Sequence, residues 1–244
     1  MESTRFRVGD VTIHATGSGA APPIVLLHAN GGDRRDFDAV VPGLASSRTV
    51  YAVDWPAHGD SSMIQGPTAC GFAQLLQSVL QGLGPGPFIL LGNSVGGFTP
   101  RTPLTLAVCH LVGNERLAPM MMRWLPRLYL RMSNEQVQAI QARASTASRV
   151  PERVGAFASL WRSFAEREHD ARVGVGALAV PTLLVWGTQD PVLPWGIDGR
   201  RAARALPRAT VARLRCGHQA FAEMPGEFLS VLEGFLQSLA GQSR

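Results

Sequence analysis

The sequence contains no lysine, and all 23 basic residues among its 244 are arginine. This absence excludes Schiff-base chemistry at a lysine, the lysine of a phosphate-binding P-loop and the Ser-x-x-Lys acylation motif. Acidic residues number 18, which leaves a net charge of +5. The arginines are interleaved with acidic residues and form no long basic run, so we expect no nucleic-acid partner.

Cysteine is also scarce. Cys70, Cys109 and Cys216 are odd in number, far apart and without C-x-x-C spacing, which argues against a disulfide framework and a zinc site. No run of 18 apolar residues occurs, and the first residues lack a signal-peptide pattern. We therefore expect a cytoplasmic protein without a membrane span. The sequence leaves the oligomeric state open.

Apolar residues make up 45% of the chain and charged residues only 17%, so a sizeable core can form. Residues 24–27, 50–53 and 88–91 are apolar at consecutive positions, which is typical of strands buried on both faces of a parallel sheet. Residues 37–44 and 72–83 have apolar residues at helical spacing. This alternation predicts an α/β fold with a mostly parallel sheet flanked by helices.

The remaining segments complete the predicted layout. Residues 5–15 alternate polar and apolar positions around Gly9-Asp10, as an edge hairpin does. Helical patterns occupy residues 104 to about 170. The strand and helix rhythm then resumes, with strands at 182–186 and 210–214 and helices at 199–206 and 221–239. We expect a core of residues 1–100 and 175–244, with residues 101–174 as a helical cap.

The strongest chemical signal is Gly92-x-Ser94-x-Gly96, directly after a predicted strand. Small residues two positions either side of the serine relieve the crowding of a strained strand-to-helix turn and leave Ser94 Oγ exposed above the sheet. An ordinary glycine-rich turn, or a backbone cradle for an anion, would produce the same pattern. The motif therefore needs support from other positions.

A serine nucleophile needs a base that takes its proton and an acid that fixes the tautomer of the base. Asp190 follows the predicted strand 182–186, and His218 follows the strand 210–214, so both lie at the sheet edge where Ser94 is expected. Asp198 is a second candidate for the acid. Upstream, the small residues of LLHANGG follow the first core strand, and we expect the backbone N–H groups of Asn30 and Val95 to form an oxyanion hole.

The motifs LLHANGG, DWPAHGDSS, GNSVGG, VWGTQDPVLP and CGHQAF together resemble those of α/β-hydrolases of the serine-nucleophile type with a helical cap. The resemblance extends from about residue 20 to the C-terminus. It implies Ser94 as nucleophile, Asp190 as acid and His218 as base. The resemblance implies a small-molecule substrate and a reaction that needs no metal or organic cofactor.

The chain departs from this family after the nucleophile, where the family has a long helix and a further core strand. Pro100 and Pro103 would interrupt a helix that begins near Val95, because proline clashes with the carbonyl four residues earlier. We read residues 104–112 as helix and expect about 20 to 30 residues of the core to be absent. The strand before Asp190 must then pair directly with the nucleophile strand, or a gap must remain between them.

Two functions follow from these patterns. One is a hydrolase that cleaves a small, largely apolar ester, thioester or related carbonyl compound through an acyl-enzyme. Met121, Trp124 and Trp161 of the cap are then candidates for the substrate pocket, although packing between cap helices explains them equally well. The alternative is a catalytically silent binding protein or an internally deleted, inactive variant.

Overall fold

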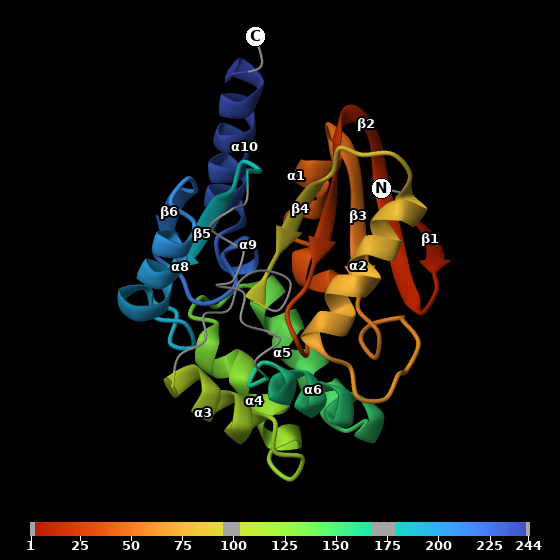
Figure 1. The fold of residues 1–244 in the computed structure, drawn as a ribbon, viewed down its shortest axis with the longest axis vertical. Coiled ribbons are helices and arrows are strands. Elements are labelled where there is room, and N and C mark those ends of the chain that lie inside the picture. Colours follow the sequence, from red (N-terminus) through yellow and green to blue (C-terminus); the bar gives the residue numbers. More distant parts are fainter. Residues whose placement is uncertain (1–2, 95–102, 167–178, 243–244) are drawn as a thin grey trace.

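The computed structural model describes residues 3–94, 103–166 and 179–242, and it has the predicted α/β fold class (Figure 1). Its strands are β1 (Ser3–Val8), β2 (Val11–Leu27), β3 (Arg48–Asp54), β4 (Ile89–Gly92), β5 (Leu183–Gly187) and β6 (Thr210–Leu214). Its helices are α1 (Val41–Ala45), α2 (Ala69–Leu83), α3 (Pro103–Val112), α4 (Ala118–Tyr129), α5 (Glu135–Ala147), α6 (Pro151–Ser163), α8 (Arg200–Ala205), α9 (Ala220–Glu223) and α10 (Pro225–Gln242). Two shorter turns of helix are η1 (Arg34–Phe37) and η4 (Trp195–Gly199).

The N-terminal hairpin is confirmed: β1 and β2 pair antiparallel around Gly9, whose φ of +58° suits a glycine. The long strand β2 then pairs with β3 twice. Thr12 to Thr16 pair antiparallel with β3. Residues 24–27 pair with β3 in a second register, in which residue numbers increase along both strands, from Ile24 opposite Val50 to Leu27 opposite Val53. The same residues of β2 pair parallel with β4, which completes a four-stranded sheet.

The centre of this sheet is buried on both faces, as its consecutive apolar residues predict. Ile24 and Leu26 point into a cluster with α1, α5, α9 and α10, whereas Val25 and Leu27 point into a second cluster with α2. All four side chains are at most 2% exposed. Alternation of side chains along a strand explains why one apolar run fills two cores.

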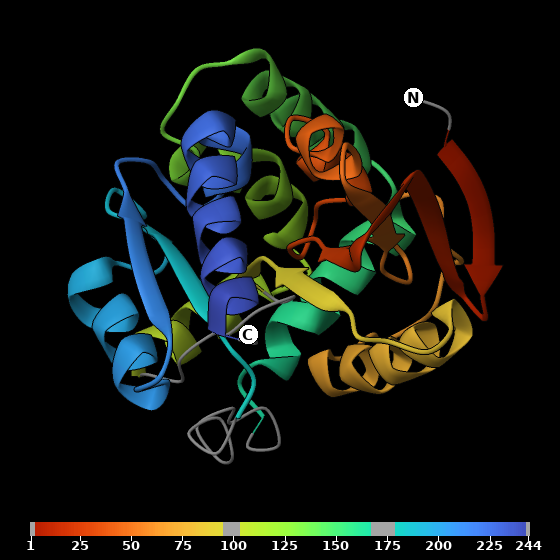
Figure 2. The ribbon, with the colours of Figure 1, turned by 90° about the horizontal axis from the view of Figure 1, so that it is seen from above.

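A gap separates this sheet from the other two strands. β5 and β6 pair parallel in a sheet of their own, and within the described ranges no strand joins β4 to β5. Of the two arrangements that the shortened sequence allows, the structure has the gap. Figures 1 and 2 show α10 between the two sheets. Phe228 and Leu232 of α10 belong to the cluster that also packs against β4 and β5.

Two predicted helices are each divided in the structure, because a proline near the start of the second part begins a new helix. The single helix predicted over 221–239 is wrong, because α9 ends at Glu223 and Pro225 begins α10 as its first residue. The helix predicted over 37–44 is also wrong: the chain forms η1, whose N-cap is Asp33, and then α1, with Pro42 in its first turn. The helical region predicted from residue 104 contains α3 to α6, which lie beneath both sheets in Figure 1.

Candidate active site

Ser94 follows β4 in a strained backbone conformation. Its φ is +53°, a left-handed value that residues other than glycine rarely adopt. The preceding residue is fixed, because the Asn93 N–H donates to the Leu27 carbonyl oxygen at 3.0 Å. A serine held at positive φ just after a strand is the geometry that the Gly-x-Ser-x-Gly pattern predicts.

Asp190 and His218 are brought into direct contact. His218 Nδ1 lies 2.7 Å from Asp190 Oδ2, and the two side chains are only 7% and 5% exposed. The other carboxylate oxygen, Oδ1, accepts the N–H groups of Val192 and Leu193 at 2.8 and 3.0 Å. The carboxylate is thus held from both sides. Because it can only accept, His218 carries its proton on Nδ1, and Nε2 is left as the basic nitrogen.

The backbone of His218 is tied to both neighbouring parts of the molecule. Its N–H donates to the carbonyl oxygen of Tyr129, at the end of α4, at 3.0 Å. Its own carbonyl oxygen accepts from Asn93 Nδ2 at 3.2 Å. The residue beside Ser94 therefore reaches across the gap between the sheets and contacts the residue expected to be the base.

Glu223 is a buried residue of this site that sequence reasoning missed. Its Oε2 accepts the N–H groups of Arg131, Met132 and Gly217, and its Oε1 accepts the N–H of Gln219. These bonds enclose His218 on both sides along the chain. The sequence offered one signal, an acidic residue in an otherwise apolar stretch five positions after His218, but no spacing rule gives it this role.

The loop predicted to supply the oxyanion hole is also held on two sides. Asn30 Nδ2 donates to the Phe157 carbonyl oxygen of α6 at 3.0 Å, and the Gly31 N–H donates to His58 Nε2 at 3.2 Å. Gly31 has a φ of +81°, and a Cβ there would lie 3.0 Å from the Phe157 ring. The second expected donor, Val95, lies outside the described residues.

His28 and His58 hold this loop as neutral side chains. Complete burial lowers the pKa of His28 to about 4. Burial, followed by the proximity of His28, lowers the pKa of His58 to about 3. His58 Nδ1 lies 2.9 Å from the Pro56 carbonyl oxygen, so the proton is on Nδ1 and Nε2 accepts from Gly31. Both histidines have the structural role expected of buried polar loop residues.

The three pocket candidates lie in helices α4 and α6. Met121 and Trp161 are partly buried and pack against the cluster of Val112, Met122 and Phe157. Trp124 is 48% exposed, with the guanidinium groups of Arg123 and Arg127 over its ring. Asp198, the second candidate acid, is 2% exposed, and its Oδ1 has no hydrogen-bond partner among the described residues.

Two depressions adjoin the site. A groove of about 1030 Å³ fills the gap between β4 and β5 and has Asn93 and His218 at one end; Phe88, Leu91, Val185 and Leu236 are among its apolar lining residues. A smaller pocket of about 460 Å³ lies between the loop at Gly31 and helices α5 and α6.

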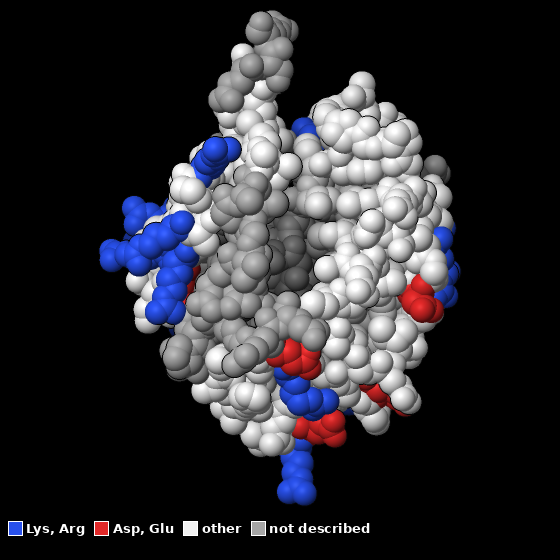
Figure 3. Space-filling view, viewed as in Figure 1, with Lys and Arg blue, Asp and Glu red and all other residues white. Residues whose placement is uncertain are grey.

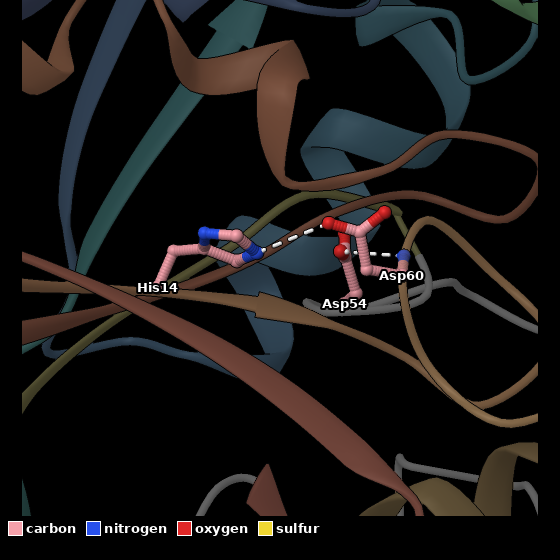
Figure 4. Close-up of side chains that lie close together, drawn as sticks. All are labelled: His14, Asp54 and Asp60. Atoms are coloured by element: carbon pink, nitrogen blue, oxygen red, sulfur yellow. Dashed lines mark hydrogen bonds and ion pairs between the residues drawn. The ribbon is translucent and has the colours of Figure 1, made fainter. Parts of the chain in front are cut away.

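One cluster has the composition of a metal site. Ligand atoms of His14, Asp54 and Asp60 lie within 4.8 Å of one another (Figure 4). Both oxygens of Asp54 already accept backbone N–H groups, from Arg34 at 2.8 Å and from Asp60 at 2.9 Å. The Arg34 guanidinium lies 3.9 Å from the same carboxylate and would repel a cation. The cluster therefore serves to fix the loop after β3.

Comparison with known proteins gives the same fold. A thermophilic esterase from Thermogutta terrifontis superposes with a TM-score of 0.79 over 98% of this chain and 99% of its own, at 21% identity. The acetyltransferase component of an acetoin-cleaving system from Pseudomonas putida is 25% identical over 91% of this chain and 65% of its own length. The pimeloyl-[acyl-carrier protein] methyl ester esterase of Aeromonas hydrophila is 26% identical over 89% of this chain and 96% of its own. Two other curated relatives are matched over only a third of their length.

The family model described as the alpha/beta hydrolase family matches residues 24–231, a range that includes Ser94, Asp190 and His218. Within the described residues, no helix is long and apolar enough to cross a membrane. The strained serine after β4, the paired aspartate and histidine after β5 and β6, and this match lead to one conclusion: the chain belongs to the alpha/beta hydrolase family.

Proposed function

We propose that this protein is a serine hydrolase that cleaves a small, largely apolar ester, thioester or related carbonyl compound. The observation that carries the proposal is the 2.7 Å contact between His218 Nδ1 and Asp190 Oδ2, which leaves Nε2 free to act as a base. Ser94, held at a left-handed φ one residue from the Asn93 contact to His218, is the nucleophile that this base would serve.

The reaction proceeds in two halves. His218 Nε2 takes the proton of Ser94 Oγ while Oγ bonds to the substrate carbonyl carbon, and the carbonyl electrons move onto its oxygen. The N–H groups of Asn30 and Val95 stabilise that oxyanion. The intermediate collapses to an acyl-enzyme as His218 gives its proton to the leaving group. Water, deprotonated by His218, then releases the acid and restores Ser94.

The remaining parts of the proposal follow from this assignment. Residues 1–100 and 175–244 act as the catalytic core, and residues 101–174 as a cap whose Met121, Trp124 and Trp161 contact the substrate. No step requires a metal or an organic cofactor. We also propose a cytoplasmic location, which the three scattered cysteines without C-x-x-C spacing favour.

The test is labelling of the folded protein with a fluorophosphonate probe. Wild type is expected to react, whereas Ser94→Ala and His218→Ala are expected to lose the label. Asp190→Asn should react about 10⁴-fold more slowly, because an amide stabilises the wrong tautomer of the histidine. Ser238→Ala, an exposed serine on α10, is the matched control and should label as wild type does.

A second function has a specific observation in its favour. The gap between β4 and β5 leaves the serine on one sheet and the aspartate and histidine on the other. If wild type unfolds cooperatively but does not react with the probe, the enzyme assignment is wrong, and a catalytically silent binding protein is the better description.

A further inference from the structure

Six exposed arginines gather on one side of the molecule. Residues 200–215 contain six arginines and no aspartate or glutamate. All six side chains are exposed, and they belong to α8, to β6 and to the turns that follow them: Arg200, Arg201, Arg204, Arg208, Arg213 and Arg215. Figure 3 shows blue side chains concentrated on the flank where Figure 1 places α8 and β6. We call this the α8–β6 arginine surface.

The periodicity of the two elements explains why these side chains share a side. In α8, Arg200, Arg201 and Arg204 have helical spacing, while Ala202 between them is fully buried. In β6, alternation places Arg213 on the exposed face. The arginines of both elements therefore point outward, and Ala202 of α8 points inward.

A direct contact joins this surface to η4. The Arg213 guanidinium lies over the Trp195 ring, 5.3 Å from its centroid. Two aliphatic side chains are exposed on the same elements: Ile197 of η4 is 47% exposed, and Val211 of β6 is 40% exposed. The surface thus combines guanidinium groups with accessible aliphatic groups.

The described residues place no acidic group in an ion pair with this surface. None of its six arginines forms an ion pair with a residue that the structure describes. The partly buried Arg143, by contrast, pairs with both Asp33 and Asp36. A concentration of unpaired positive charge attracts an anionic partner over about 8 Å at physiological salt.

We propose that the α8–β6 arginine surface binds the anionic headgroups of a lipid surface. One guanidinium group can donate two parallel hydrogen bonds to two oxygens of the same phosphate. Ile197 and Val211 would enter the boundary between the headgroups and the acyl chains. A nucleic acid fits less well, because Arg213 already covers a face of Trp195, the aromatic ring that it contacts on η4. The proposal does not depend on the catalytic assignment.

The experiment is vesicle flotation, which measures membrane binding and does not require catalytic activity. Wild type is expected to bind vesicles made of equal parts phosphatidylcholine and phosphatidylglycerol and not to bind vesicles of pure phosphatidylcholine. It should dissociate from the anionic vesicles as the salt concentration rises. The triple variant Arg200→Gln/Arg204→Gln/Arg208→Gln should bind about 100-fold more weakly, since each arginine near an anionic membrane contributes about fivefold. Ile197→Ser should also weaken vesicle binding.

A matched triple variant separates this surface from net charge. Arg116→Gln/Arg123→Gln/Arg149→Gln removes the same charge from exposed positions on the cap and should bind as wild type does. Equal losses in the two triple variants would overturn the proposal, as would failure of wild type to bind the anionic vesicles. A third outcome would also overturn the proposal. If the protein binds single-stranded RNA but not vesicles, and Ile197→Ser binds the RNA as well as wild type does, the partner is a nucleic acid.

Discussion

Single buried polar residues hold the candidate catalytic groups in place. Glu223 is 4% exposed and accepts four backbone N–H groups around His218, and Asp190 accepts two more beside its contact with the imidazole. Hydrogen bonds to a buried charged acceptor are stronger than neutral ones, and their donors cannot turn to water when the acceptor is removed. The position of His218 is therefore fixed by its neighbours along the chain as well as by its own side chain.

Glu223→Gln tests this arrangement. The variant keeps one acceptor oxygen and replaces the other with an NH₂ group that faces backbone donors, so we expect the free energy of unfolding to fall by about 2 kcal/mol. Urea unfolding measures the change. Glu227→Gln, an exposed glutamate on α10, is the control and should stay within about 0.5 kcal/mol of wild type. An equal effect of the two substitutions would contradict the role given to Glu223.

His58 makes a second prediction at this scale. Because its Nε2 accepts the Gly31 N–H, His58→Leu should let the loop at Asn30 move and lower kcat about 10- to 100-fold, with little change in KM. His58→Gln offers an amide oxygen to the same N–H and should recover part of the loss. Steady-state kinetics on a small ester would show the split. A rise in KM at unchanged kcat would instead assign His58 to substrate binding.

At the scale of elements, the edges of β4 and β5 are the weak point of the fold. Both strands line the groove of about 1030 Å³, and no described strand pairs with the facing edges. Leu90 of β4 is 49% exposed at this edge. Open strand edges with apolar side chains favour pairing between molecules.

Leu90→Lys should therefore reduce self-association without loss of stability. A charge on an edge strand opposes pairing with another chain, and the exposed side chain contributes little to folding. Light scattering at rising protein concentration would detect the change. Leu128→Lys, at a position 58% exposed on α4 and away from any strand edge, adds the same charge and should have no comparable effect.

Sequence reasoning predicted elements well where one physical signal dominated. The strands at 24–27 and 50–53 were found because consecutive β-branched and aliphatic residues suit a sheet covered on both faces, and β6 was found at its observed bounds. The strand predicted at 88–91 is present as β4, but the prediction that it is buried on both faces is wrong, because β4 lies at the sheet edge and Leu90 is 49% exposed. The proline at the start of α10 was overlooked because the apolar spacing continues through it. The contact of Asp190 with His218 follows from loops at one sheet edge, whereas Glu223 and Asn93 could not be assigned, since their partners are backbone groups brought close only by folding.

For the whole molecule, buried titratable groups set the dependence of stability on pH. The folded-state pKa values of His28 and His58, about 4 and about 3, lie below the ordinary value of 6.5. Below pH 6.5 the unfolded chain binds protons that the folded protein excludes, so these residues destabilise the fold as pH falls. Asp36 acts in the opposite direction, because burial raises its pKa to about 7 and favours the fold at low pH.

We expect the combined effect of His28 and His58 to exceed that of Asp36, so the free energy of unfolding should fall as pH falls from 6.5 to 4. Urea unfolding across this range would measure the slope. His58→Gln should make the slope shallower, and His110→Gln, at an exposed position on α3, should not change it. A stability that rises on acidification would show that Asp36 dominates instead.

The divided sheet also has a consequence for heating. Ser94 belongs to the sheet of β1 to β4, and Asp190 and His218 follow β5 and β6, so no ladder of backbone hydrogen bonds among the described strands links the serine to the histidine. Side-chain packing of α5, α9 and α10 and side-chain hydrogen bonds such as that of Asn93 keep them in register instead. Such contacts loosen before strand ladders do. The protein should therefore lose its reactivity at a lower temperature than the one at which its secondary structure melts.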